Sequence, residues 1–390
     1  MTQMHDVDLT AWLEDLRVLT GRDCGTHNKR GVDEMGSFVA QRCRAWGWEV
    51  QRHAQSEYGD CYVAVARGSG QGNILLMGHL DTVYPNGTAE ARPWRELDGK
   101  LFAPGACDMK GGLLVGMHAM RALQLAAPDR FGALTFFFNS EEEYGSPVSR
   151  GIAADLARQA DAALVYEPAR MSGDIVSARK ASADFTLTVR GLAAHAGVAP
   201  EKGINATVEL AHRIIDLQAL SGLAPGVTVT PSFVQGGTAT NVVPDQALVR
   251  IDVRAADAGG MRAVEAALRA VAAKTTVAGS KCELTGGFSF PPMEKGPGVA
   301  LMADLAWQAA HDLGFTINDV ATGGASDASL LSQFTPTIDG MGPVGGNAHN
   351  AETEYIVMAS IAQRIQLSIK LIGALLEPAT LGRLRALKPV

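Results

Sequence analysis

A histidine and an aspartate end the apolar run NILLMGHLDT (residues 73–82). In an extended chain, residues two positions apart point to the same side, so His79 and Asp81 are predicted to face together. An imidazole beside a carboxylate is a common pairing of a metal ligand with its orienting partner. A structural His–Asp pair that caps a strand would give the same motif, so this motif alone leaves both interpretations open.

Three consecutive glutamates, Glu141, Glu142 and Glu143, follow a second apolar run, ALTFFFNS (residues 133–140). Adjacent carboxylates repel one another and resist desolvation unless a cation holds them. A solvated loop is the alternative, because runs of charge usually face water. A loop that is simply solvated need not follow so apolar a strand, and this favours a cation site.

Three further potential ligands follow comparable segments. Asp108 lies in the Gly-rich turn APGACDMKGG, Glu167 follows the run AALVY, and His349 lies in the loop GGNAHNAETEY. Each is ordinary alone, as a capping aspartate, a surface glutamate or a loop histidine. Together with the first two motifs they place two histidines and at least three carboxylates at strand ends. Such N and O ligands suit two divalent metal ions of the kind of zinc, manganese or cobalt.

The elements that must position these groups alternate between strand-like and helix-like segments over residues 1–180. That alternation predicts an α/β domain with parallel strands and crossover helices, in which ligands bind at the carboxyl ends of the strands. Over residues 181–290 the strands alternate apolar with polar residues, as half-buried antiparallel strands do, and two helices separate them. The α/β pattern returns at residues 291–390. The sequence therefore predicts a discontinuous domain (1–180 and 291–390) with an inserted α+β domain (181–290).

Composition excludes several classes of protein. The 390 residues carry a formal net charge of −7, which argues against a nucleic-acid partner. Five cysteines form no CxxC pair and are odd in number, which indicates reduced thiols and a cytoplasmic location. The acidic start, MTQMHDVDLTAWLEDL, does not resemble a signal peptide, and no apolar run is long enough to predict a membrane span.

A series of motifs resembles the metallopeptidase family that contains glutamate carboxypeptidase, aminoacylase, peptidase T and succinyl-diaminopimelate desuccinylase. The motifs occur in that family's order and span nearly the whole chain: MGHLDTVYP, PGACDMKGG, NSEEEYGS, YEPA, AAHAG, TNVVP, IDVR, GGASDA and AHNAETEY. They are closest to the glutamate carboxypeptidase-like members. The resemblance implies a catalytic domain with a mostly parallel mixed sheet flanked by helices. It also implies that the inserted domain is ferredoxin-like and serves as a lid and dimerisation domain.

The resemblance also implies a role for each site residue. Two divalent metal ions, Zn²⁺ with Mn²⁺ or Co²⁺ as alternatives, would share Asp108. The remaining implied metal ligands are His79, Glu143, Glu167 and His349, with Asp81 steadying His79. Glu142 would be the general base, which leaves Glu141 without a part in the chemistry. In a homodimer, His195 of the inserted domain would stabilise the oxyanion in the other subunit, while Asn241 and Arg254 would bind a substrate carboxylate.

These roles imply a hydrolase that cleaves the amide bond of a small N-acyl amino acid or dipeptide with a free carboxylate. Glutamate-specific members of the family carry a cationic residue near GGFSF, where this sequence has Phe288. Phenylalanine cannot bind a second carboxylate as a guanidinium does, so strict glutamate specificity is not expected. The alternatives are a metal-dependent amidase acting on an aromatic or non-peptide C–N bond and a non-catalytic binding protein. A serine hydrolase is excluded because the sequence contains no GxSxG motif.

Overall fold

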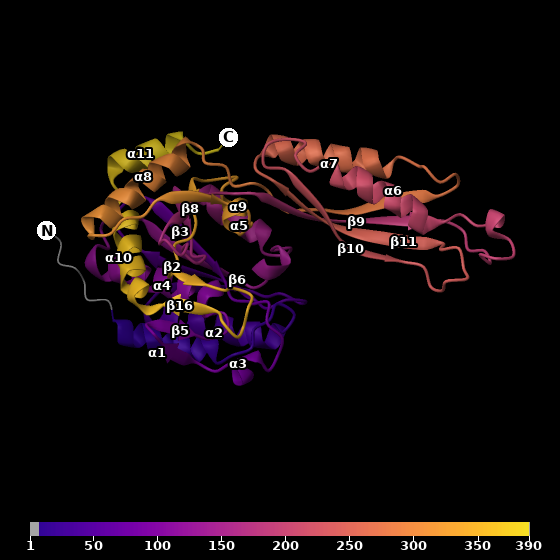
Figure 1. Cartoon of the computed structure of the whole chain (residues 1–390). Helices are drawn as coiled ribbons and strands as arrows, with labels where there is room; N and C mark the ends of the chain where they lie inside the picture. The colour runs from indigo at the N-terminus through magenta and orange to yellow at the C-terminus, as the bar shows by residue number, and fades with distance from the viewer. Residues whose placement is uncertain (1–7, 390) are drawn as a thin grey trace. The chain divides into compact units, whose positions relative to one another are not determined.

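The computed structural model describes residues 8–389, in which the chain forms two units (Figure 1). The first unit comprises the chain up to Ala178 together with Lys295–Ala321 and Ser326–Val390. The second comprises Arg179–Glu294 and Thr322–Ala325. Residues 1–7, which include the beginning of the acidic N-terminal stretch, and residue 390 lie outside the described range.

A six-stranded mixed sheet forms the centre of the first unit. Its order is β1 (Glu49–His53), β2 (Cys61–Arg67), β6 (Ala133–Asn139), β3 (Asn73–His79), β7 (Ala162–Val165) and β14 (Thr337–Ile338). The strands from β6 to β14 are parallel, whereas β1 and β2 are antiparallel to their neighbours. Nearly every residue of β3 and β6 is buried, which explains why both read as continuous apolar runs.

Helices flank this sheet, which confirms the predicted α/β class. The main helices are α1 (Leu9–Thr20), α2 (Lys29–Ala45), α4 (Gly111–Ala126), α5 (Arg150–Gln159), α8 (Pro297–Asp312), α10 (Met358–Leu375) and α11 (Pro378–Ala386). The shorter ones are α3 (Thr88–Ala91), α9 (Ala328–Leu331), η1 (Ala106–Lys110) and η2 (Glu142–Tyr144). Helix α4 packs against β2, β3 and β6 and also contacts α1 and α10, while α5 packs against β3.

The chain also forms two small sheets. One has the order β15 (Gly345–Gly346), β16 (Tyr355–Val357), β5 (Lys100–Phe102) and β4 (Arg95–Leu97), and the other pairs β13 (Asp319–Thr322) with β8 (Ile175–Arg179). Residues 355–357 form β16 and pair with β5 before α10 begins at Met358.

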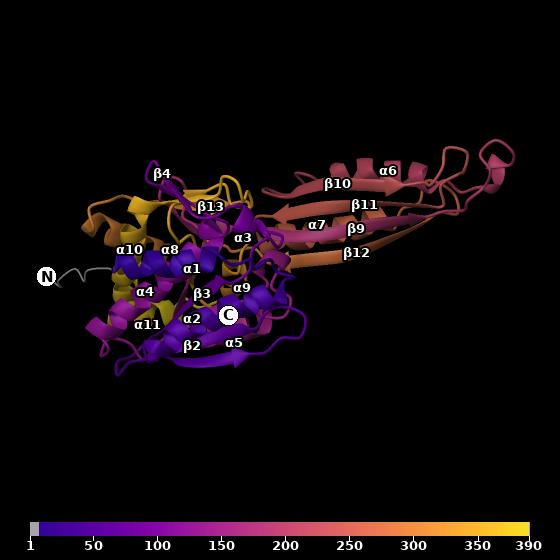
Figure 2. The ribbon, with the colours of Figure 1, turned by 90° about the horizontal axis from the view of Figure 1, so that it is seen from below.

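The second unit has the predicted ferredoxin-like α+β topology. Along the chain it contains β9 (Ala181–Arg190), η3 (Pro200–Lys202), α6 (Ala206–Gln218), β10 (Thr228–Gly236), β11 (Gln246–Ala255), α7 (Ala258–Ala272) and β12 (Lys281–Phe290). The antiparallel sheet has the order β10-β11-β9-β12, which can be followed in Figure 2. Both helices lie on one face of this sheet (Figure 1) and enclose one apolar core. Strand β12 ends at Phe290, close to the predicted end of the inserted domain at residue 290.

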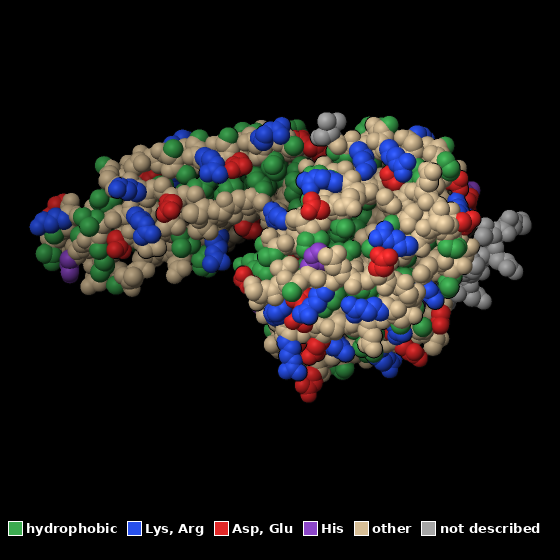
Figure 3. Space-filling model, turned by 180° about the vertical axis from the view of Figure 1, so that it is seen from behind, with side chains coloured by type: hydrophobic (Ala, Val, Ile, Leu, Met, Phe, Trp, Pro, Cys, Tyr) green, Lys and Arg blue, Asp and Glu red, His purple; other side chains and the backbone are tan. Residues whose placement is uncertain are grey.

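Charged side chains of both signs lie on the surface of the described residues. On the face drawn in Figure 3, Lys and Arg side chains are interspersed with Asp and Glu among the described residues. Within residues 8–389, no helix combines the length and apolar character needed to cross a membrane.

Candidate metal centre

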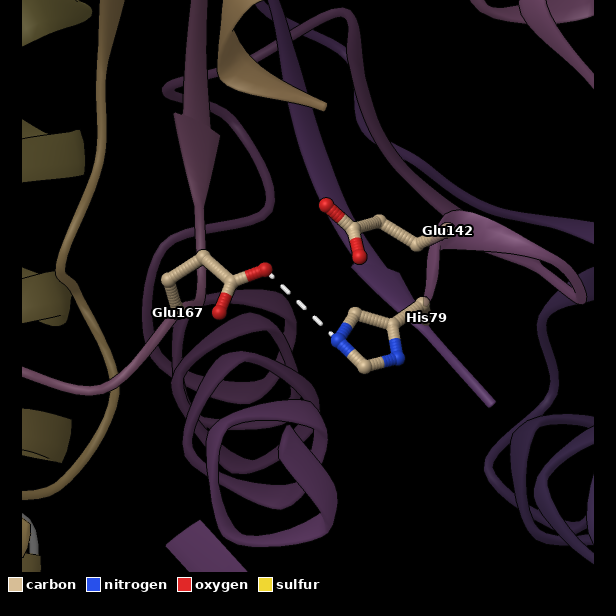
Figure 4. A group of neighbouring side chains, drawn as sticks. All are labelled: His79, Glu142 and Glu167. Carbon is tan, nitrogen blue, oxygen red and sulfur yellow. Dashed lines mark ion pairs between the residues drawn. The ribbon is translucent and has the colours of Figure 1, made fainter. Parts of the chain in front are cut away.

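Three neighbouring parallel strands bring the first group of predicted residues together. In the sheet register His79, the last residue of β3, pairs with Asn139 at the end of β6. Glu142 follows β6, and Glu167 follows β7 two residues after its last residue. Potential ligand atoms of His79, Glu142 and Glu167 lie within 4.8 Å of one another, and Figure 4 shows the three side chains converging. The His79 Nε2 to Glu167 Oε1 distance is 3.6 Å.

Asp108 lies between the two predicted histidine ligands. Its Oδ1 is 3.1 Å from His79 Nε2, and its Oδ2 is 3.3 Å from His349 Nε2. The same His349 nitrogen is 3.3 Å from Glu143 Oε2. Asp108 has extended dihedral angles (φ −117°, ψ 97°) within η1, so the segment is not a regular helix at this point. Each oxygen of one carboxylate therefore faces a different imidazole, which is the arrangement expected of a ligand shared by two cations.

Asp81 contacts His79, which it was predicted to steady, and it also contacts the turn that carries Glu142 and Glu143. His79 Nδ1 lies 3.0 Å from the Asp81 carbonyl oxygen and 3.3 Å from Oδ1. The buried carboxylate also accepts hydrogen bonds from the backbone N–H groups of Glu142 and Glu143 at 3.2 and 3.3 Å. The Thr26 hydroxyl donates to Oδ2 at 2.7 Å. Asp81 thus connects the end of β3 to the turn that carries both glutamates.

The run of three glutamates is not a solvated loop. Glu141 is fully buried, and its carboxylate accepts hydrogen bonds from the Ser140 hydroxyl and from the backbone N–H groups of Ser140, Val148 and Ser149. Glu141 therefore ties the turn η2 to the start of α5. Glu142 and Glu143, by contrast, point to the histidines, as the geometry above describes.

The two glycines of DMKGG allow α4 to begin close to Glu167. A Cβ built on Gly112 would lie 1.9 Å from the Tyr166 carbonyl oxygen, and one on Gly111 would lie 2.6 Å from the Ala106 carbonyl oxygen. Backbone atoms cannot move aside as a flexible side chain can. Only glycine therefore permits this approach between the Asp108 segment and the end of β7.

Burial and mutual charge shift the pKa values of these groups strongly. Burial, with neighbouring carboxylates such as Glu167, raises the pKa of Glu142 well above its usual value. Burial also raises the pKa of Glu143. Hydrogen bonds with Asp108 and Glu143 raise the pKa of His349 to about 10. Burial alone would lower the pKa of His79, but Asp108 and Asp81 outweigh it and raise that pKa well above its ordinary value. Buried carboxylates outnumber the histidines at this centre, so its electrostatic environment favours the binding of cations.

An unsatisfied carboxylate oxygen also indicates that these residues suit divalent cations. Within residues 8–389, no hydrogen-bond donor reaches the buried Oε1 of Glu143. A buried carboxylate oxygen without a donor costs free energy unless a cation occupies its lone pairs. Two imidazoles with carboxylates also match the ligand chemistry of zinc, manganese and cobalt. His349 has a positive φ of 66°, a rare conformation for a residue other than glycine.

The remaining predicted residues belong to the second unit. His195 and Asn241 lie on adjacent segments, because His195 forms a bridge with Val242 and the Ala196 N–H donates to the Asn241 carbonyl oxygen at 2.9 Å. Arg254 lies on β11, where its guanidinium contacts both carboxylate oxygens of Asp252 at 2.6–3.1 Å. The Arg254 side chain is thus already paired with a carboxylate of its own strand.

Phe288 contributes to the core of the second unit. Its ring meets that of Phe185 edge to face, with centroids 6.1 Å apart, and packs against the buried residues of the sheet and helices. Phe288 therefore has a packing role that the sequence comparison with glutamate-specific members did not anticipate.

Two buried acids of the centre were missed from the sequence. Asp327, in GGASDA, accepts hydrogen bonds from Asn139 Nδ2 at 2.7 Å and Ser146 Oγ at 2.6 Å, and burial raises its pKa to about 7. Glu354, in AHNAETEY, accepts hydrogen bonds from Tyr84 and from the Asp108 segment. Both residues stand inside motifs that carried the family resemblance. Nothing in their spacing distinguished Glu354 from the nearby Glu352.

Comparison with known proteins identifies the family of the chain. The sequence profile of Peptidase family M20/M25/M40 matches residues 75–374. Carboxypeptidase G2 of Pseudomonas sp. (strain RS-16) is 30% identical over 369 residues, which cover 93% of this chain and 88% of that protein. Succinyl-diaminopimelate desuccinylase of Bordetella avium (strain 197N) is 26% identical over 359 residues, covering 87% and 92%. The YXEP protein of Bacillus subtilis, a dinuclear metal binding peptidase, shares the fold with a TM-score of 0.68 at 17% identity over 95% of this chain and 98% of that chain.

Proposed function

This chain belongs to peptidase family M20/M25/M40 and is a hydrolase of amide bonds, and from that premise we propose that it uses two metal ions to cleave a small N-acyl amino acid or dipeptide. The substrate carries a free carboxylate, as expected of a carboxypeptidase or aminoacylase type of enzyme. One observation carries this proposal above the others. It is the Asp108 carboxylate, whose two oxygens face His79 and His349 separately.

We divide the proposed ligands into two sets that share Asp108. His79 and Glu167 form one set, and His349 and Glu143 form the other. Zn²⁺ is the proposed ion, with Mn²⁺ or Co²⁺ as alternatives that this donor set also accepts. When bound, the ions lower the pKa of a water molecule and supply positive charge beside the scissile carbonyl oxygen.

Glu142 is the proposed general base. It lies within the cluster formed with His79 and Glu167 but belongs to neither proposed ligand set. Its carboxylate removes the proton of the attacking water and then delivers it to the nitrogen of the leaving amine. Burial of Glu142 favours the neutral carboxyl group that forms when it has taken up the proton.

His195 is the proposed donor to the oxyanion. The backbone N–H groups of Gly197 and Val198 donate to its Nδ1 at 3.2 and 3.1 Å. An imidazole whose Nδ1 accepts hydrogen bonds carries its proton on Nε2, and that nitrogen can donate to a developing oxyanion. In this proposal the histidine acts on the centre of a second copy of the chain.

A homodimer through the second unit is part of the same proposal. Strand β10 is an edge strand, and its exposed side chains include Phe233 and Val234. Val208 and Ile215 of the adjacent helix α6 are also exposed. An open edge with apolar side chains favours pairing with another chain. A second copy would cover this surface.

Asn241 and Arg254 are the proposed partners of the substrate carboxylate. Arg254 can take this role by exchanging Asp252 for the substrate, because both present a carboxylate to the same guanidinium.

We place the enzyme in the cytoplasm, since all five cysteines are free thiols in the structure.

The Glu142→Gln variant tests the mechanism. Loss of the base is expected to lower kcat about 10²- to 10⁴-fold while two metal ions stay bound, because Glu142 is in neither ligand set. Metal content is measured after loading with zinc, manganese or cobalt, and hydrolysis is measured on a panel of N-acyl amino acids and dipeptides. Glu352→Gln is the control, since Glu352 is an exposed glutamate on the His349 loop and should leave both quantities unchanged. Near-normal turnover by Glu142→Gln would refute the mechanism.

A further inference from the structure

Glu354 forms an unusually complete set of hydrogen bonds beside the metal centre. Its side chain is buried (1% exposed), and each of its two carboxylate oxygens accepts two hydrogen bonds. The backbone N–H groups of Cys107 and Asp108 donate to Oε1 at 2.8 and 3.0 Å. The Gly105 N–H and the Tyr84 hydroxyl donate to Oε2 at 2.8 and 2.6 Å.

These contacts connect three of the segments that carry the proposed ligands. Tyr84 lies five residues after His79, and Glu354 itself lies five residues after His349. The other three donors belong to the turn that ends in Asp108. One carboxylate therefore spans the ends of the His79 segment, the Asp108 turn and the His349 loop.

The Asp108 N–H is the contact that matters most for the centre. Asp108 lies in an irregular segment, where helical hydrogen bonds do not fix its backbone. A hydrogen bond to its own N–H, and another to the N–H one residue earlier, restrict the orientation of its Cα–Cβ bond. That bond directs the carboxylate whose two oxygens face His79 and His349.

We propose that Glu354 is a positioning residue that sets the metal affinity of the centre by orienting Asp108. This inference rests on the proposed two-metal function. Glu354 touches neither the ions nor the substrate in this proposal, and it acts only through the backbone of the shared ligand. Partners of metal ligands commonly change metal affinity about 10- to 100-fold when they are replaced.

The Glu354→Gln variant is the main test. The substituted amide has one NH₂ group, and either orientation directs it at a backbone N–H that formerly donated to an oxygen. Zinc affinity measured by competition with a chromophoric chelator is expected to fall about 10- to 100-fold. The absorption spectrum of the cobalt-loaded protein should also change, because the orientation of Asp108 affects the ligand field of the cobalt ions. A purely structural role would leave both of these readouts at their wild-type values.

Two further variants separate positioning from charge. Glu354→Asp keeps the negative charge but is one methylene shorter, so it is expected to lose affinity as Glu354→Gln does. Tyr84→Phe removes one of the four hydrogen bonds and leaves the three backbone contacts, so its zinc affinity should stay within about threefold of the wild type. Wild-type affinity in Glu354→Asp would show that charge alone suffices and would overturn the proposal.

Asp161→Asn is the control for general destabilisation. Asp161 is also a buried carboxylate of the first unit, and it accepts hydrogen bonds from the Asn73 N–H and from Arg385. It should lower the free energy of unfolding of the metal-free protein without changing zinc affinity. Equal zinc affinities for Glu354→Gln and Asp161→Asn would overturn the positioning role. A wild-type chain that binds no metal would instead refute the proposed function itself.

Discussion

Replacing Asp81 with asparagine removes one negative charge at the centre. It also replaces one hydrogen-bond acceptor, a carboxylate oxygen, with a hydrogen-bond donor, the NH₂ group. The two residues have nearly the same shape, so the change is chemical rather than steric. In the wild type, Oδ1 accepts from the Glu142 N–H and Oδ2 accepts from the Glu143 N–H and the Thr26 hydroxyl. An asparagine NH₂ group in either position meets a backbone N–H that can no longer donate to it.

The magnitude follows from that lost hydrogen bond. A buried N–H left without an acceptor costs about 1–3 kcal/mol, which corresponds to about 5- to 150-fold in an equilibrium constant. A shift of the turn that carries Glu142 and Glu143 would remove this cost, because the N–H could then find another acceptor. Metal binding requires that turn in place, so the cost appears as weaker metal affinity and a lower kcat/KM.

Chelator competition measures the metal affinity, and hydrolysis of the best substrate of the panel measures kcat/KM. Thr26→Val is the matched control, because it removes one donor to Asp81 and leaves the carboxylate charged. Its expected cost is about 1 kcal/mol, or about fivefold. If Asp81→Asn binds zinc within twofold of the wild type, Asp81 does not hold the two glutamates in place.

Three other outcomes are expected. Burial lowers the pKa of His118 to about 4, so the folded state favours its neutral form, and stability that is complete above pH 6.5 falls as the pH decreases towards 4. His118→Phe should remove about 2 kcal/mol of the difference between urea unfolding at pH 7.5 and at pH 4.5 in metal-free protein, and an unchanged difference would contradict this. Gly112→Ala should weaken zinc binding at least about tenfold, as its Cβ would meet the Tyr166 carbonyl at 1.9 Å, and wild-type zinc affinity would show that α4 can move aside. Val234→Lys should give monomers in light scattering, because it places a charge on the β10 edge, whereas an intact dimer would exclude this edge as the interface.

The sequence was sufficient for the fold class and for the approximate location of the centre. Apolar runs that end in polar residues identified β3 and β6, and parallel strands place their carboxyl ends at one edge of a sheet. His79 and Glu167 therefore come together for a reason that is visible in the sequence. The run of three glutamates could be recognised as unusual for the same reason, because it directly follows the buried strand β6.

The tertiary structure decided how the individual carboxylates are used. Glu141 turned out to be an anchor for α5, and Arg254 is paired with Asp252 on its own strand. Glu354 reaches Gly105, which lies 249 residues away in the chain. Local periodicity reflects which face of a strand or helix is buried, but it contains no information about hydrogen bonds between segments so far apart. Those bonds depend on where the loops meet after the sheet has formed, and only the folded chain determines that.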